Sequence, residues 1–182
     1  MPLQRTAVVL AAELCLLATL GCEVKTSVRV ESGPSFSFDG SGRLVSFSVY
    51  GPKLGHKIAT PLDAKSLLWS FESASGFPGA LVVRMDLAYG KVPGGYVQTV
   101  PSHGTAASPR AGLVYYFEAE TTGAPGVYGF FYMDKNEPVR INVPDLCASA
   151  FVEDVRPVKC GTKDPYVEPK DLGQFVRENR IR

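Results

Sequence analysis

The chain has 182 residues, of which 45% are hydrophobic, and its 19 basic and 18 acidic side chains leave a formal net charge of +1. This balance provides no basic excess of the kind that nucleic-acid-binding proteins use, so the sequence predicts no nucleic-acid partner. The 14 prolines and 18 glycines are spread between short apolar runs, which favours one folded domain with many turns and few long helices.

The amino-terminal segment has the parts of a secretory signal. A start with one basic side chain precedes an apolar stretch at residues 6–20, and a small residue precedes Cys22. The stretch is shorter than the roughly 17–25 residues of a membrane span, and Glu13 would be costly at the centre of a bilayer. We predict a signal peptide at residues 1–21 and a mature domain at 22–182, against a retained transmembrane helix or a core helix of a cytosolic protein.

The end of this segment, Leu17-Ala-Thr-Leu-Gly-Cys22, resembles the lipobox of bacterial lipoproteins. In that family the cysteine thiol is acylated, the signal is cut just before the cysteine, and the new amino terminus is acylated as well. The resemblance implies a lipid anchor on Cys22, where several acyl chains together hold a protein firmly on a membrane. Thr19 and Leu20 depart from the usual leucine and small residue, so cleavage after Gly21 into a soluble periplasmic or secreted product is the alternative.

The residue after Cys22 bears on which membrane carries the anchor. In enteric bacteria an aspartate at that position retains a lipoprotein in the inner membrane, and here the residue is Glu23. The resemblance therefore implies a protein of the bacterial cell envelope that is held on the outer membrane and faces the periplasm.

The cysteine count agrees with an exported protein. Cys15 would leave with the signal, so the mature chain would keep Cys22, Cys147 and Cys160. An odd cysteine in an exported protein needs an explanation, and lipidation of Cys22 supplies one. We predict that Cys147 and Cys160 form a disulfide in an oxidising compartment; two unpaired buried thiols are the alternative.

Alternation of apolar and polar residues predicts short strands along most of the mature chain. Strands at 35–38 and 43–50 flank the turn residues of 39–42 and predict a β-hairpin. Residues 90–111 form mostly a loop. Other strands are predicted at 24–30, 57–60, 66–72, 80–89, 96–100, 112–120, 127–134 and 139–143. Without a βαβ rhythm, this pattern predicts an all-β fold, an antiparallel immunoglobulin-like β-sandwich.

The chain changes character in a C-terminal extension at residues 164–182. One helix is predicted at 171–180, because Leu172, Phe175 and Val176 lie on one side at helical spacing. We expect this helix to dock on the sheet; a partner-binding tail is the alternative.

Motifs for known enzymatic chemistries are missing from the sequence. It has no Gly-x-Ser-x-Gly elbow and no Walker-type loop. His56 and His103 lie in glycine-flanked turns without a second ligand at a recognisable spacing. Cys147 and Cys160 are too far apart for a Cys-x-x-Cys site. The sequence therefore predicts no catalytic residue, metal or cofactor.

Carboxylates are the remaining catalytic option. Glu118 and Glu120 share one face of a predicted strand, while Glu72 and Asp86 lie on neighbouring segments. Paired carboxylates about 5–9.5 Å apart across a groove can hydrolyse glycosides. Glutamates that alternate along a strand more often form its solvent face, so a hydrolase is the least favoured hypothesis.

Aromatic residues crowd the predicted strands at 112–120 and 127–134, and they must divide between the two faces of the sheet. One set should be core. The other set forms an exposed binding surface or, as we favour, lies beneath the terminal helix or residues 90–111. The candidate surface consists of Tyr116, Tyr128 and Tyr132.

The body of the chain is similar to a pattern in small bacterial lipoproteins of unassigned activity. The similarity rests on Leu68-Trp69, Tyr89-Gly-Lys-Val-Pro93, Gly95-Tyr-Val-Gln98, Pro101 and Gly112-Leu-Val-Tyr-Tyr116. It implies a strand, a loop and a return strand, and it assigns no functional residue. The sequence therefore predicts a lipid-anchored structural or interaction module whose partner is an envelope protein or a glycan. A small-ligand or glycan-binding module is the alternative.

Overall fold

The computed structural model describes residues 25–52, 57, 59, 64–75, 79–141 and 172–181. Strands dominate this part of the chain, with one 3-10 turn, η1 (Ala64–Ser66), and one α-helix, α2 (Leu172–Asn179). The strands are β1 (Ser27–Glu31), β2 (Ser35–Asp39), β3 (Arg43–Tyr50), β4 (Leu67–Ser73), β5 (Met85–Ala88), β6 (Tyr96–Val100), β7 (Val114–Thr122), β8 (Val127–Asp134) and β9 (Glu137–Ile141).

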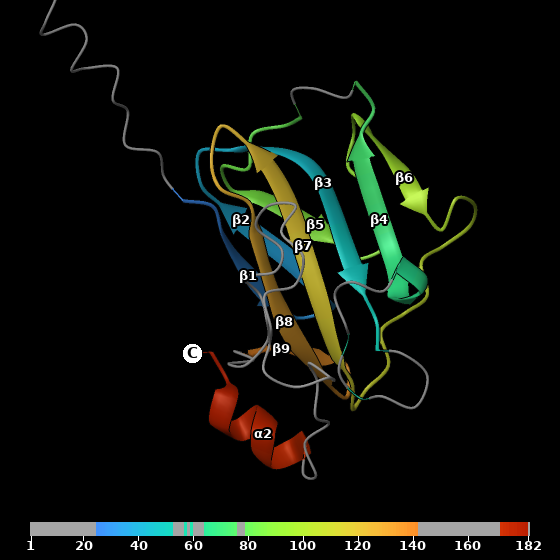
Figure 1. Cartoon of the computed structure of the whole chain (residues 1–182), viewed down its shortest axis with the longest axis vertical. Coiled ribbons are helices and arrows are strands. Elements are labelled where there is room, and N and C mark those ends of the chain that lie inside the picture. The colour runs from blue at the N-terminus through green and yellow to red at the C-terminus, as the bar shows by residue number, and fades with distance from the viewer. Residues whose placement is uncertain are drawn as a thin grey trace, which may run out of the picture.

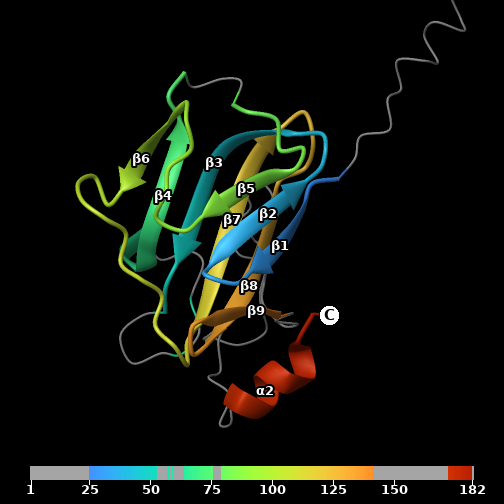
Figure 2. The same ribbon diagram turned by 180° about the vertical axis from the view of Figure 1, so that it is seen from behind.

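These strands form two antiparallel sheets, one of three strands in the order β1-β2-β5 and one of six in the order β6-β4-β3-β7-β8-β9. Figures 1 and 2 show the smaller sheet lying across one face of the larger, with α2 near β9. The predicted all-β sandwich with one short C-terminal helix is therefore confirmed.

The core between the sheets is built from aromatic rings on the inner faces of both. Phe36 of β2 lies 4.8 Å from Phe47 of β3 and 5.7 Å from Phe131 of β8, between ring centroids. All three rings are fully buried. Each contributes about 1.5–3 kcal/mol by leaving water, so this packing is the main force that holds the two sheets together.

The predicted hairpin of β2 and β3 is wrong. β2 pairs with β1 and β5, whereas β3 pairs with β4 and β7. Residues 39–42 instead carry the chain from one sheet to the other, so the two strands face each other through Phe36 and Phe47. Gly40 makes this crossing tight, because a Cβ atom there would lie 2.8 Å from the Thr26 Cα.

The strand predicted at 80–89 forms only in its second half, as Met85–Ala88. Arg84 has a left-handed φ of 52°, and it ends a turn that breaks the alternation. As a result Val82 is fully buried, whereas Leu81 is 51% exposed.

One side of the core, beside β5, is covered by the loop at residues 101–113, and we call this the loop side. Ala106 and Leu113 pack against the core from this loop. The Tyr89 hydroxyl donates to the Ala107 carbonyl at 2.8 Å. The Tyr115 hydroxyl accepts from the Arg110 N–H at 2.6 Å. Neutral hydrogen bonds and small apolar side chains thus close this side.

Helix α2 docks on the outer face of the six-stranded sheet, as predicted. Leu172 and Val176 are buried in a second cluster with Tyr116, Phe130 and Ile141. After the helix the chain pairs with the edge of β9, where the Ile181 N–H donates to the Arg140 carbonyl at 3.0 Å. The outer face of β8 and β9 is therefore covered in part.

The predictions for residues 1–21, Cys22, His56, Cys147 and Cys160 lie outside the described residues. Among the helices that the structure does describe, none has the length and apolar character needed to cross a membrane.

Candidate functional site

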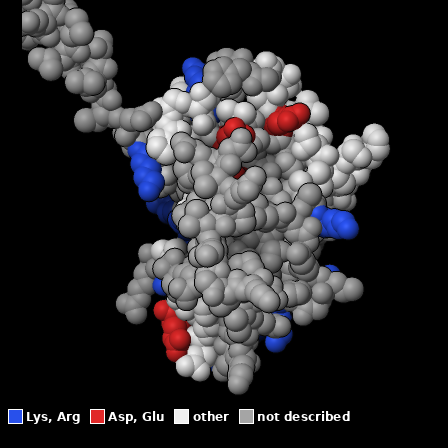
Figure 3. Space-filling view, in the orientation of Figure 1, with Lys and Arg blue, Asp and Glu red and all other residues white. Residues whose placement is uncertain are grey.

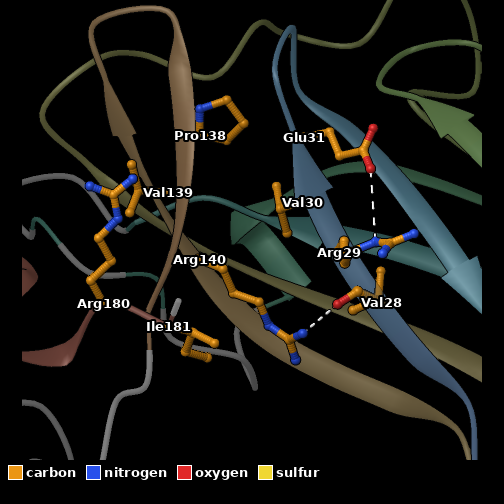
Figure 4. A pocket seen from close by; sticks show the side chains of 9 residues that line it. All are labelled: Val28, Arg29, Val30, Glu31, Pro138, Val139, Arg140, Arg180 and Ile181. Carbon is orange, nitrogen blue, oxygen red and sulfur yellow. Dashed lines mark hydrogen bonds and ion pairs between the residues drawn. The ribbon is translucent and has the colours of Figure 1, made fainter.

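A pocket of about 350 Å³ lies where the edge strands of the two sheets meet. β1, an edge of the smaller sheet, lies beside β9, an edge of the larger, and we call this junction the seam. The seam pocket is lined by residues 28–31, 138–140 and 180–181 (Figure 4). Its volume falls at the lower end of the range of about 300–1,000 Å³ that is usual for ligand pockets.

The β1 wall of the seam pocket presents backbone groups. The Val28 carbonyl accepts a hydrogen bond from the Arg140 side chain, so it points away from β2 (Figure 4). Backbone groups of alternate residues point to the same side of a strand. The N–H and carbonyl of Val30 therefore also face the pocket, and β1 has no second neighbour among the described strands. Within the described part of the chain, this wall is an unpaired strand edge at Val30.

The β9 wall differs, because its edge is blocked. Ile181 already bonds to the Arg140 carbonyl, and Pro138 has no N–H to offer. Proline on an edge strand is a common device against unwanted strand pairing. Of the two edges at the seam, β1 is thus the one able to accept another strand.

Arg140 brings a charge into this junction. It stands opposite Phe131 in the β8–β9 register, so its side chain projects from the inner face of the sheet. Its guanidinium carbon lies 5.9 Å from the centroid of the Phe117 ring. Burial lowers the pKa of Arg140 from its ordinary value, though guanidinium groups stay protonated in proteins.

Within the described residues this cation lacks a compensating carboxylate. The ion pair found there joins Arg29 to Glu31 at 3.9 Å, and it lies on exposed side chains. The Arg140 Nε atom is buried and has no hydrogen-bond partner in the described part of the chain. A partly buried charge needs paired or hydrogen-bonded neighbours to offset its desolvation. The arrangement suits an anionic group that enters the pocket.

The other charged residues of the seam pocket strengthen this preference. Among the described residues that line the pocket, the charged side chains are Arg29, Arg140, Arg180 and one carboxylate, Glu31. Three positive charges less one negative give these residues a local balance of +2. Arginine is also the side chain best suited to carboxylates and phosphates, since its planar fork makes two parallel hydrogen bonds.

The three tyrosines of the candidate binding surface differ in burial. Tyr116 is fully buried, with its ring centroid 5.0 Å from that of Phe130, in the cluster that α2 covers. Tyr132 is partly buried, and Tyr128 is 37% exposed. For Tyr116 the covered alternative therefore holds, since this ring is buried in the same cluster as Leu172 and Val176 of α2.

The predicted carboxylates lie on the outer face of the six-stranded sheet. Glu118 stands opposite Ser48, and Glu120 stands opposite Ser46, whose hydroxyl donates to the Glu120 Oε2 at 3.1 Å. Burial, and to a lesser extent the charge of Glu120, raises the pKa of Glu118. In Figure 3 acidic groups gather over the upper part of this face.

Glu72 and Asp86, which lie on neighbouring segments of the chain, are placed in different sheets. Glu72 stands opposite Ser46 in the larger sheet, whereas Asp86 stands opposite Ser37 in the smaller one. The two segments follow each other in sequence but enter different sheets. His103 is exposed, and no group of three or more potential metal-ligating side chains occurs among the residues that the structure describes.

Arg140 was missed by sequence reasoning because it alternates with Val139 and Ile141. That pattern places an arginine on the solvent side of a half-buried strand. The structure reverses the assignment, since Ile141 packs under α2 while Arg140 turns toward Phe117. The sequence did contain a signal for this reversal. The aromatic residues of β7 and β8 require apolar cover on a second face of the sheet, and Ile141 supplies part of it.

A comparison with protein-family models, with curated proteins and with solved structures found no match for this chain.

Proposed function

We propose that this protein is a non-enzymatic interaction module of the bacterial cell envelope that binds an anionic partner in the seam pocket. The observation that carries the proposal is the Arg140 guanidinium, which lines the pocket without a carboxylate partner among the described residues. An anion held there would offset the desolvation of that charge. The inner aromatic core and the blocked edge of β9 would hold the site rigid.

In this proposal a lipid anchor on Cys22 holds the module on the outer membrane, facing the periplasm. The sequence motif that ends at Cys22 supports it. From Cys22 to Ser27, where β1 begins, the chain has five steps, which span at most about 18 Å when extended. The seam would therefore be presented close to the membrane surface.

Membrane fractionation tests the anchor. Cys22→Ala should move the protein from the membrane pellet to the soluble fraction, while Cys147→Ala, which removes a different thiol, should leave it in the pellet. Retention of Cys22→Ala in the pellet would contradict anchoring by lipid.

Anion-dependent stability tests the site. Inorganic phosphate should raise the melting temperature of the wild-type protein more than sodium chloride of equal ionic strength, since a ligand that binds the folded state stabilises it. Arg140→Met should lose this difference. Arg110→Met removes an exposed charge on the loop side and should keep it. If phosphate raised the melting temperature of Arg140→Met and Arg110→Met equally, the proposed site would be wrong.

A carboxylate hydrolase is the second candidate, and one observation favours it. Burial, with a smaller contribution from the charge of Glu120, raises the pKa of Glu118, as a general acid requires. If this candidate held, the double variant Glu118→Gln, Glu120→Gln would lose a cellular phenotype that Arg140→Met retains. We expect the opposite pattern.

A further inference from the structure

We propose that the partner of the seam pocket is an extended acidic peptide segment of another protein, which adds as a new strand to the edge of β1 that has no neighbour among the described strands. The inference rests on the proposed function, because it assumes that the seam pocket is the binding site. It goes further by naming the chemistry and the geometry of the ligand.

The backbone of β1 supplies the geometric part. Val30 turns its N–H and carbonyl toward the pocket, and β1 is an edge strand of the described sheet. An extended peptide beside β1 would form main-chain hydrogen bonds with these groups, as in other cases of strand addition. The Val28 carbonyl of β1 is already bonded to the Arg140 side chain, so the segment would pair with β1 at Val30.

The blocked edge of β9 gives the added strand one partner only. Pro138 offers no N–H, and the Arg140 carbonyl is bonded to Ile181. The peptide would therefore take its register from β1 and meet β9 through side chains. The Arg140 guanidinium has five N–H donors, and one of them is bonded to the Val28 carbonyl. The remaining donors can meet a carboxylate of the incoming strand.

Charge selects an acidic segment. A strand in the seam would have side chains on both of its faces. Those on the inner face would meet Arg140, and those on the outer face would meet Arg29. The local balance of +2 would repel a basic peptide and favour one with glutamates or aspartates. A neutral peptide would gain the main-chain bonds but leave Arg140 uncompensated.

Peptide binding to the purified mature protein tests the charge. The probe is a capped peptide of about eight residues with alternating threonine and glutamate, and its control has glutamine in place of glutamate; affinity is measured by fluorescence anisotropy. We expect the glutamate peptide to bind at least about tenfold more tightly than the control. We also expect a loss of at least about tenfold with Arg140→Met and little change with Arg110→Met. Equal affinity for both peptides, or for wild type and Arg140→Met, would overturn the proposal.

A second comparison tests the strand pairing itself. Val30→Pro removes the N–H that faces the pocket, and proline is tolerated at such edge positions; the peptide should bind at least about tenfold more weakly. If this variant does not fold, a glutamate peptide with alternate N-methylated amides tests the same bonds on the wild-type protein. Strand addition would be contradicted if Val30→Pro bound the glutamate peptide with wild-type affinity, or if the wild-type protein bound the N-methylated peptide as tightly as the unmodified one.

The failures of the two proposals are distinguishable. If phosphate stabilises the protein through Arg140 but the glutamate peptide does not bind, the seam is an anion site and the peptide inference is wrong. If neither ligand depends on Arg140, the proposed site itself fails.

Discussion

The loop side and the seam close the same aromatic core in different ways. On the loop side, tyrosine hydroxyls bond to backbone groups of residues 107 and 110, and small apolar side chains fill the space. At the seam a guanidinium bonds to the backbone of Val28 beside a pocket of about 350 Å³. Figure 2 shows the two on different sides of the sandwich.

The two sides therefore contribute differently to folding and to binding. The neutral closure on the loop side stabilises the fold, because the Tyr89 and Tyr115 hydroxyls bond to backbone groups within the chain. The partly buried guanidinium beside the seam pocket contributes little to the free energy of folding, and its remaining hydrogen-bond donors can bind a ligand. Substitutions on the loop side should therefore lower stability, whereas substitutions at the seam should change binding and leave stability nearly unchanged.

The largest effect is expected from Trp69→Ala on the loop side. Trp69 is fully buried, and its ring centroid lies 5.1 Å from that of Tyr89. Truncation would leave a cavity and should lower the free energy of unfolding by about 3–5 kcal/mol, measured by urea denaturation. A loss below about 1 kcal/mol would mean that the loop side does not hold the core.

A smaller loss is expected from Tyr115→Phe. The Tyr115 hydroxyl accepts from the Arg110 N–H and donates to the Arg110 carbonyl at 3.2 Å. Removing it should lower the free energy of unfolding by about 1 kcal/mol, the usual contribution of such bonds. Tyr128→Phe, on a partly exposed ring of the other face, is the matched control and should lose less.

At the seam, Arg140→Met should change the free energy of unfolding by less than about 1 kcal/mol. The methionine keeps an apolar stem against Phe117. The loss of the hydrogen bond to the Val28 carbonyl is offset, because the substitution also removes a partly buried charge without a carboxylate partner among the described residues. Urea denaturation of this variant beside Tyr115→Phe gives the comparison directly. A loss of several kcal/mol would show that Arg140 is a structural residue, and the separation of the two sides would fail.

The smallest effect concerns the polar outer face, and it depends on pH. The folded state raises the pKa of Glu118 above its ordinary value of 4.5, because burial disfavours the charged form. Protonated Glu118 therefore favours folding below that value, and this contribution is lost as pH rises through the folded pKa. Glu118→Gln should raise the melting temperature at pH 7, and the gain should disappear at about pH 4.

A control variant makes that measurement more specific. Glu120 is exposed, so Glu120→Gln should give a smaller gain at pH 7. A melting temperature of Glu118→Gln at or below that of the wild type at pH 7 would contradict the assigned cause of the shift.

Much of the strand pattern followed from the sequence. β3 and β8 have the predicted bounds, because aromatic and β-branched residues alternate cleanly between turns. The pairing of β2 with β3 was wrong for a physical reason: a tight turn between two alternating strands has the same local pattern in a hairpin as in a crossing between sheets. Only the long-range contact of Phe36 with Phe47 decides between them.

The candidate site was harder to predict. Which face of β9 is buried depends on α2, which lies far along the chain and covers Ile141. Local alternation cannot contain that information, so Arg140 was assigned no role. The seam pocket likewise requires two edges that are remote in sequence, β1 and β9.

Hydrogen exchange at the Val30 amide tests the central claim most directly. In the free protein this N–H faces the pocket and should exchange rapidly, as expected for an edge without a strand partner. With the glutamate peptide bound, its exchange should slow markedly, while amides of residues 101–113 on the loop side stay unchanged. Saturation with the peptide that leaves the Val30 amide exchanging at its free rate would contradict the assignment of the seam as a strand-addition site.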